Sequence, residues 1–165
     1  MEYHKRKNIR LPGYDYRQAG GYFVTICTEE RRCILSSVKM GNKFVHADVR
    51  LSELGTIVET AINETEVRTG IQVHDYGIMP NHIHLMLLIP RRNEAYSVGS
   101  FVGMLKSLAL YRWRMLCSQR GVRTGKVWQR NYFEHIIRNE QDYQEKLRYI
   151  GENPDAWCED ELHKE

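Results

Sequence analysis

The feature that most constrains the fold is the short apolar run His84–Ile89. The turn-forming pair Pro80-Asn81 precedes this run and a proline follows it, so both of its ends are marked. A bounded apolar run of this length predicts a buried β-strand. His82 and His84 stand at its entry, and residues two apart in a strand point to the same face of the sheet. We therefore expect two imidazoles side by side, either as metal ligands or as ordinary histidines at a strand edge.

Turn residues and hydrophobic periodicity divide the rest of the chain into further elements. We expect additional strands at 20–28, 71–79 and 126–139, and helices at 52–70, 97–121 and 139–153. A loop or short hairpin is expected over residues 31–47, with its turn at Gly41-Asn42. The last helix should end at Asn153, because the residue before a proline is disfavoured in the α conformation.

This order of elements is β-α-β-β-α-β followed by a helix, which predicts an α+β, ferredoxin-like split βαβ fold. Such a fold has one antiparallel sheet with two helices packed on one face. It places the strand at 20–28 in the middle of the sheet, beside the strand that begins with the histidines, and a site is expected on the open face. We expect a single domain over 1–165, with a basic N-terminal arm at 1–19, a C-terminal helix at 139–153 that carries Tyr149, and an acidic tail at 154–165.

Composition favours a cytoplasmic protein and argues against a membrane partner. No apolar run approaches the roughly 20 residues that a membrane-spanning helix needs. The basic N-terminus is not followed by the apolar segment of a secretory signal. The 4 cysteines form no Cys-x-x-Cys pair, so we expect reduced thiols rather than a disulfide framework or a zinc ribbon.

Basic residues are concentrated in two blocks, one in the first forty residues and one between Arg91 and Arg130, while the C-terminal segment is acidic. Basic blocks are typical of proteins with a polyanion partner, and a solvated helix face is the alternative. Lys126 and Arg130 lie near Trp128 and Tyr132, and such a mixture of charge and aromatic surface suits unstacked bases. The residues expected to contact nucleic acid are Lys5, Arg6, Lys7, Arg10, Arg91, Arg92, Lys106, Arg112, Arg114, Lys126 and Arg130.

The segments "MPNHIHLML" and "VWQRNYFEHIIRNEQDYQEKLRYIGENP" give the chain a recognisable pattern, His-x-His followed by Tyr-Ile-x-x-Asn-Pro. With these motifs the chain resembles the REP-associated tyrosine transposases, single-tyrosine members of the HUH nuclease class. The opening segment "KNIRLPGYDYRQAGGYFVTICTEER" is also similar to that family, so the resemblance covers roughly residues 5–155. The two-part motif is far more specific than either of its parts.

The resemblance implies metal-dependent cleavage and joining of single-stranded DNA at hairpin or palindromic repeats, through a 5′-phosphotyrosine intermediate. It implies that His82 and His84 bind a divalent cation, Mg²⁺ or Mn²⁺, and that Tyr149 is the nucleophile. Asn153 would complete the metal site, at a position where related transposases carry glutamine. Members of this class work as monomers or as homodimers that exchange the tyrosine helix, and both states remain open for this chain.

Each of these assignments has a structural alternative. Tyr149 could be a core residue of an amphipathic helix, in which case Tyr143 is an equal candidate by residue type. Asn153 could simply end its helix, a position that asparagine favours. His135 could face the site or serve packing alone. For the whole chain, the alternatives are a nucleic-acid-binding relative without catalysis and a metal-dependent phosphodiesterase that uses water instead of tyrosine.

Overall fold

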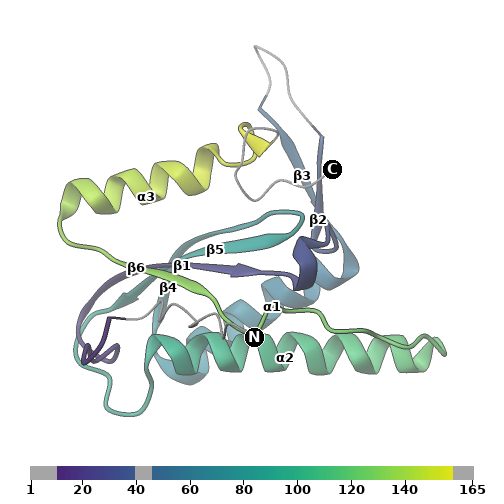
Figure 1. Ribbon diagram of the computed structural model, residues 1–165, viewed down its shortest axis with the longest axis horizontal. Helices are drawn as coiled ribbons and strands as arrows, with labels where there is room; N and C mark the ends of the chain where they lie inside the picture. Colours follow the sequence, from purple (N-terminus) through teal and green to yellow (C-terminus); the bar gives the residue numbers. More distant parts are fainter. Residues whose placement is uncertain (1–10, 40–45, 158–165) are drawn as a thin grey trace, which may run out of the picture.

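A computed structural model describes the chain over residues 11–39 and 46–157 (Figure 1). One antiparallel sheet has four strands in the order β4-β5-β1-β6, and a separate two-stranded sheet pairs β2 with β3. The elements are β1 (Gly20–Cys27), the short turn η1 (Glu29–Arg31), β2 (Ser36–Lys39), β3 (Asp48–Leu51), α1 (Glu53–Thr69), β4 (Gln72–Ile78), β5 (His82–Ile89), α2 (Val98–Gln119), β6 (Phe133–Ile136) and α3 (Glu140–Glu152).

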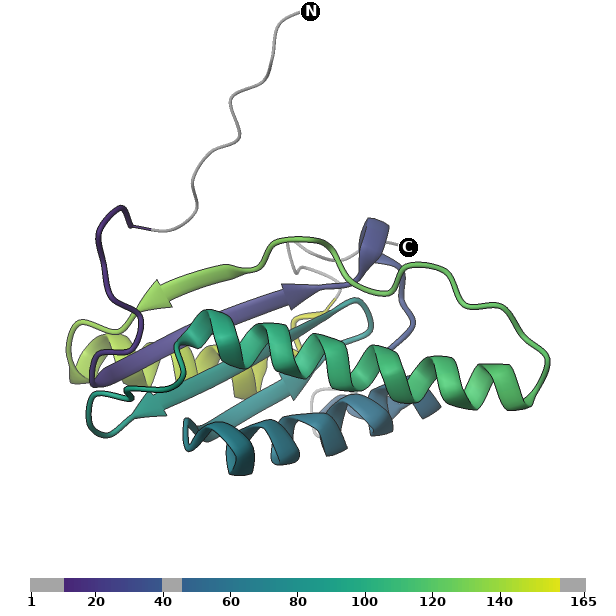
Figure 2. The ribbon, with the colours of Figure 1, turned by 90° about the horizontal axis from the view of Figure 1, so that it is seen from below.

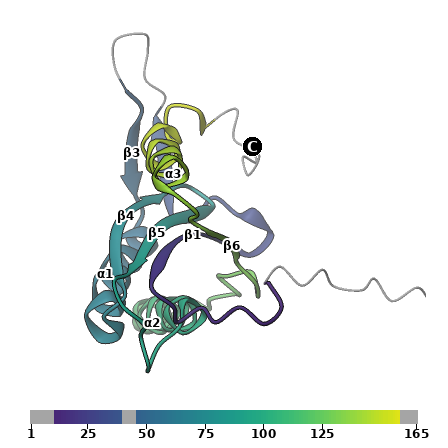
Figure 3. The ribbon, with the colours of Figure 1, turned by 90° about the vertical axis from the view of Figure 1, so that its left-hand side faces the viewer.

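The topology confirms the predicted ferredoxin-like fold. When the β2–β3 hairpin is set aside, the elements follow the order β-α-β-β-α-β, and the first strand lies between the third and the fourth. Helices α1 and α2 cover one face of the sheet, and α3 lies over the other (Figures 1 and 2). Seen end-on, the sheet separates α3 from the α1–α2 layer (Figure 3).

Side chains along the two central strands, β1 and β5, point alternately to the two faces of the sheet. The sheet therefore has a large hydrophobic core on one face and a small one on the other. Tyr22, Val24 and Ile26 of β1 point to the face covered by α1 and α2, where the main hydrophobic core lies. The opposite face carries a small cluster of Phe23, Met86 and Ile150, which joins the sheet to α3. Strand β5 is therefore covered on both faces, as its continuous apolar run predicted.

The caps of the two long helices agree with the turn residues read from the sequence. The side chain of Ser52 accepts a hydrogen bond from the Gly55 amide, and Gly70 ends α1 with a φ of 67°. Ser97 and Ser100 form a capping box at the start of α2. No helix in the described ranges is long and apolar enough to cross a membrane.

The strand expected over 126–139 is much shorter in the structure, and this part of the prediction is wrong. Only Phe133–Ile136 pairs with β1, apart from an isolated bridge between Thr28 and Trp128. The amino group of Lys106 on α2 donates hydrogen bonds to the carbonyls of residues 129, 130 and 131, at 2.9, 3.4 and 3.1 Å. The amide of Gln129 still donates to the Cys27 carbonyl, so this segment contacts the end of β1 around Trp128, and continuous pairing with β1 begins only at Phe133.

The short hairpin, one of the two alternatives expected over 31–47, is present: β2 pairs with β3, which begins just after this range, and the turn at Gly41-Asn42 lies outside the described residues. The expected end of α3 needs adjustment. Asn153 keeps helical dihedral angles (φ −57°, ψ −39°), so the reason given for the end of α3 is wrong. Pro154 ends the helix for a different reason: it has no N–H to donate to the carbonyl of Ile150 one turn earlier.

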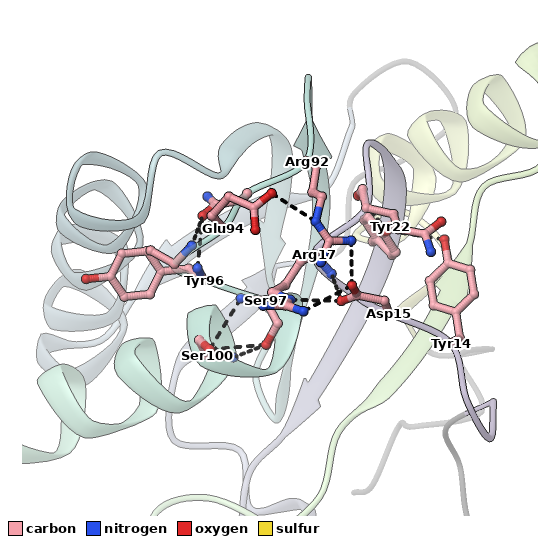
Figure 4. A network of polar contacts seen from close by, with 12 residues as sticks. Tyr14, Asp15, Arg17, Tyr22, Arg92, Glu94, Tyr96, Ser97 and Ser100 are labelled. Carbon is pink, nitrogen blue, oxygen red and sulfur yellow. Dashed lines mark hydrogen bonds and ion pairs between the residues drawn. The ribbon is translucent and has the colours of Figure 1, made fainter.

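The segment before β1 is tied to the domain by a polar network (Figure 4). Asp15 accepts a hydrogen bond from Arg17 at 3.0 Å and forms an ion pair with Arg92 at 2.7 Å. These two guanidinium groups, Arg17 first, lower the pKa of Asp15 to about 2. Backbone bonds from Asn93 to Arg17 and from Val98 to Tyr16 complete the attachment. Within the predicted arm at 1–19, residues 15–18 are therefore part of the folded domain, and residues 1–10 lie outside the described ranges.

Gly55 marks the closest approach between α1 and the loop before β2. A Cβ atom at this position would lie 2.1 Å from the carbonyl oxygen of Leu35, so Gly55→Ala must displace backbone. We expect this substitution to lower the free energy of unfolding by about 3 kcal/mol, measured by urea denaturation. The matched control is Gly103→Ala on α2, where a Cβ meets nothing within 4 Å. Alanine there should raise stability by about 0.5–1 kcal/mol, and equal effects at the two positions would contradict the packing argument.

Candidate active site

The two histidines at the start of β5 lie together on the face of the sheet that α3 covers. His82 and His84 are both buried, and their ring centroids are 4.4 Å apart. The antiparallel register places Cys27 opposite His82 and Thr25 opposite His84, at the end of β1. The side-by-side arrangement expected from the spacing is confirmed.

Each imidazole is oriented by a hydrogen bond to its Nδ1 atom. Nδ1 of His82 lies 2.8 Å from Oδ1 of Asn81, and because an amide oxygen only accepts, Nδ1 carries the proton. Nδ1 of His84 shares a 2.8 Å hydrogen bond with the hydroxyl of Thr25. A histidine held through Nδ1 in this way presents Nε2 as the atom that could bind a metal.

The electrostatic environment favours neutral imidazole. Burial, followed by the nearby His82 and the positive charge of Lys146, lowers the pKa of His84 well below its ordinary value. Nε2 of His84 is buried and has no hydrogen-bond partner among the described residues. Histidine binds a metal ion in its neutral form, so the lowered pKa of His84 suits a metal ligand.

Helix α3 carries Tyr149 over this pair. The Tyr149 ring lies 5.1 Å from the His84 ring and 6.0 Å from the Phe23 ring, both edge-on, and 44% of the residue is exposed. Trp157, beyond the end of the helix, lies 6.0 Å from the His82 ring. The C-terminal end of α3 therefore runs along the two histidines, and Asn153, which is buried, comes between Tyr149 and Trp157 in the chain.

The tyrosine stands in a pocket of about 390 Å³ that reaches the solvent. Three of its lining residues are not among those expected from the sequence: Arg31, Phe133 and Lys146. Lys146 precedes Tyr149 by three positions and so shares its helix face, a signal that was present in the sequence. Arg31 carries no such signal, because a turn of unusual backbone geometry brings it to the pocket. The complete lining is Phe23, Thr25, Arg31, His84, Phe133, Lys146 and Tyr149.

The basic residues expected to bind nucleic acid are dispersed over the molecule. Arg112 pairs with Glu64 between α2 and α1, on the far side of the sheet from Tyr149. Arg92 forms ion pairs with Asp15 and Glu94 (Figure 4), and Lys126 lies 2.8 Å from Glu29. Lys106 bonds three carbonyls, while Arg91, Arg114 and Arg130 are exposed. Lys5, Arg6, Lys7 and Arg10 lie outside the described residues.

The aromatic surface predicted beside Lys126 and Arg130 is not present. Trp128 and Tyr132 are both buried and belong to the main hydrophobic core. The short bridge between Thr28 and Trp128 draws this segment against the end of β1, so its aromatic side chains pack inward. Unstacked bases cannot reach either ring in this structure.

His135 links the last strand to the tyrosine helix. Its Nε2 lies 2.9 and 2.8 Å from the two carboxylate oxygens of Asp142, in the first turn of α3. The same carboxylate accepts a bond from the Arg138 amide, and the side chain of Asn139 caps the helix. Because α3 is held at its N-terminal end in this way, Tyr149 has a defined position over the sheet.

The site thus combines a buried imidazole pair with a partly exposed tyrosine, on a ferredoxin-like sheet, within one chain. A family model described as "Transposase IS200 like" matches residues 21–153. The chain belongs to the IS200-like transposase family, and the resemblance read from its motifs is confirmed.

Individual relatives agree with this assignment. An uncharacterized protein of Haemophilus influenzae is 29% identical over 97% of this chain and 94% of its own length. A REP-associated tyrosine transposase of Escherichia coli is 23% identical over 84% of the chain and 68% of its own length. A solved structure of a REP-associated tyrosine transposase bound to a REP hairpin has the same fold, with a TM-score of 0.62 at 19% identity. The structural match covers 88% of this chain and 72% of the solved chain.

The hydrogen bonds between His135 and Asp142 generate a prediction for pH. They lower the pKa of Asp142, so the charged carboxylate stabilises the fold above the ordinary carboxyl pKa, and this contribution is lost as the pH falls through the lowered value. Asp142→Asn should therefore lower the free energy of unfolding by about 1–2 kcal/mol at pH 7, and by progressively less below pH ~4. Urea denaturation across this range measures the difference.

The control for this measurement is Glu145→Gln, which removes an exposed carboxylate from the same helix. It should change stability by less than about 0.5 kcal/mol at every pH. If the free energy of unfolding differed by the same amount between wild type and Asp142→Asn down to pH 3, the carboxylate charge would not be what holds the helix.

Proposed function

We propose that this protein cleaves and rejoins single-stranded DNA at hairpin-forming repeats, through a 5′-phosphotyrosine intermediate on Tyr149. Membership of the IS200-like transposase family supports the reaction class. The observation that carries the proposal is the position of Tyr149, whose ring lies 5.1 Å from that of His84 at the wall of an open pocket. A hydroxyl nucleophile lines the same pocket as His84, one of the residues proposed to hold a cation, and phosphoryl transfer requires both of these components.

The residues present fit a divalent cation held by His82, His84 and the amide oxygen of Asn153. Both imidazoles are held through Nδ1, and Nε2 of His84 is buried. Within residues 11–39 and 46–157 no group of three His, Cys, Asp or Glu residues could hold a metal, so oxygen donors from substrate or water must supply the remaining ligands. Mixed nitrogen and oxygen ligands suit Mg²⁺ or Mn²⁺. When bound, the cation would neutralise a non-bridging oxygen of the phosphate.

The chain itself supplies the nucleophile and its orientation. In the proposed step the Tyr149 oxygen forms a bond to phosphorus, the bond from phosphorus to the 3′ oxygen breaks, the tyrosine proton is released and the 3′ oxygen takes up a proton. Attack by a 3′-hydroxyl on the phosphotyrosine reverses the step and rejoins DNA without an external energy source. The clamps at the N-terminal end of α3 restrict the motion of Tyr149 before the reaction, which favours an in-line approach.

We also propose that the protein is active as a monomer. Helix α3 packs on the sheet of its own chain through Ile150, Phe23 and Met86, which places Tyr149 beside the histidines of the same chain. The proposed substrate is a hairpin of the kind named for the solved relative, a REP hairpin.

Tyr149→Phe tests the nucleophile. In the presence of Mn²⁺ and single-stranded hairpin DNA, the wild type should form a covalent adduct that survives a denaturing gel. We expect the substitution to reduce the adduct by at least about a thousandfold, while DNA affinity stays within about twofold. His82→Ala and chelation of the metal should also abolish the adduct.

Tyr143→Phe is the matched control, since Tyr143 lies on the same helix and is absent from the lining of the pocket. It should form the adduct at the wild-type rate. Cleaved DNA ends that persist in Tyr149→Phe would instead identify a phosphodiesterase that uses water. Tight, salt-sensitive binding with no adduct in the wild type would identify a non-catalytic binding protein.

The lack of a carboxylate in the pocket predicts that metal and DNA bind cooperatively. Imidazole and amide ligands bring no negative charge to a divalent cation, and a phosphate oxygen would supply it. In the Tyr149→Phe background, which prevents turnover, hairpin DNA should raise Mn²⁺ affinity by at least about tenfold, measured from the electron paramagnetic resonance signal of free Mn²⁺. The same DNA with the additional change His82→Ala corrects for Mn²⁺ bound by DNA alone. Equal Mn²⁺ affinity with and without DNA would contradict shared coordination.

A further inference from the structure

The pocket beside Tyr149 has a wall that the proposed reaction does not use. Arg31 enters it from η1, Lys146 from α3 and Phe133 from β6, three elements that are distant in the sequence. The wall thus offers two basic groups and one aromatic ring next to the candidate nucleophile. Among the residues that the structure describes, no acidic side chain lines this pocket.

We propose that Arg31, Lys146 and Phe133 form a nucleotide-binding subsite beside Tyr149. Arg31 and Lys146 bind oxygens of the phosphodiester backbone, and Phe133 stacks on the base of a nucleotide next to the cleaved bond. This inference rests on the proposed function, because it assigns to the same pocket the part of the substrate that flanks the reacting phosphate.

Lys146 is held at the pocket by its surroundings. It precedes Tyr149 by three positions on α3, and its amino group lies 5.5 Å from the centre of the Phe23 ring. Arg148, only two positions further on, is exposed and does not line the pocket. A positive charge over an apolar floor, with no carboxylate on the lining, favours an anionic ligand.

Arg31 occupies the pocket at a conformational cost. Glu30 and Arg31 both have left-handed backbone angles, with φ values of 57° and 54°, which non-glycine residues adopt infrequently. The turn is held by a hydrogen bond from the Arg31 amide to the Thr28 carbonyl. The Arg31 carbonyl also accepts a bond from the side-chain amide of Asn81, the residue that orients His82. One turn therefore supports a candidate metal ligand and brings a guanidinium group to the pocket, which gives the strained backbone a function.

Phe133 supplies an exposed aromatic face. It pairs with Thr25, the residue that orients His84, and 49% of it is accessible to solvent although it belongs to the central sheet. An aromatic ring at the mouth of a basic pocket suits a nucleobase, because every base has a face on which to stack. A small anion alone would leave this ring without a role. A volume of about 390 Å³ also falls within the usual range for small-molecule sites.

The test uses the full chain and a fluorescein-labelled pool of DNA hairpins with randomised single-stranded flanks. Anisotropy titrations in EDTA at several NaCl concentrations give affinity and salt dependence, and denaturing gels with Mn²⁺ give the rate of adduct formation. The variants are Lys146→Gln, Arg31→Gln, Phe133→Ala and Phe133→Tyr. The matched controls are Arg148→Gln, on the same helix, and Tyr111→Ala, which removes an exposed aromatic ring from α2.

Lys146→Gln and Arg31→Gln should each reduce the slope of log affinity against log salt by about 0.7, the value for one phosphate contact on a single strand. Phe133→Ala should weaken binding by about 5- to 150-fold with little change in that slope, and Phe133→Tyr should restore it. Both controls should match the wild type. Restoration by Phe133→Tyr shows that the loss in Phe133→Ala is not a folding defect.

The two readouts separate failure of the subsite from failure of the proposed reaction. If the wild type forms the adduct, but Lys146→Gln, Arg31→Gln and Phe133→Ala bind and react as it does, the subsite is wrong and the reaction stands. If the wild type forms no adduct, but the variants lose affinity and salt dependence as stated, the subsite stands and the reaction is wrong. Equal losses in the controls would attribute the effect to general surface charge and overturn the subsite.

Discussion

The antiparallel pairing of β1 with β5 is the interaction on which the rest of the structure depends. Its register sets Thr25 opposite His84 and Cys27 opposite His82, at the end of the sheet where η1 begins. A shift of one residue would turn both imidazoles towards the core beneath α1 and α2, because side chains alternate between faces. Burial of Val24, Ile26 and the alternate residues of β5 opposes that shift, since the apolar surface would then face α3.

Helix α3 completes the candidate active site, because it carries Tyr149 over the histidines of the sheet. A ferredoxin-like sheet with its two helices on one face leaves the other face open, and α3 covers only part of it (Figure 3). The helix makes few apolar contacts, through Ile150 and its neighbours, so its position depends strongly on polar clamps at its ends. His135 and Asp142 hold one end, while Asp155 beyond the other end bonds the His46 side chain and the Ala47 amide next to β3. A helix held by polar contacts at both ends can have a well-defined position without a large apolar interface.

The distribution of charge along the sequence does not predict which basic residues would face DNA. Within the basic block at 91–130, Arg112 and Lys126 pair with acids from other elements, and Lys106 bonds backbone carbonyls. Arg112 connects α2 to α1, Lys106 connects α2 to the segment before β6, and Lys126 connects that segment to η1. Lys146, by contrast, lies in the acidic C-terminal segment and yet faces the pocket with Tyr149. Net charge sums residues along the chain, whereas a ligand meets only those that the fold brings to one surface.

The sequence by itself determined the order of elements, the helix caps at Ser52 and Ser97, the buried strand with its histidine pair, and the motif that identifies the family. These features are local, since each depends on residues a few positions apart. The length of β6 could not be predicted, because it depends on the contact of residues 129–131 with Lys106 on a helix that is distant in the sequence. Only the tertiary structure decided that Trp128 is buried and that Arg31 and Phe133 line the pocket with Tyr149. Such placements depend on contacts between segments far apart in the chain, and neither spacing nor composition records them.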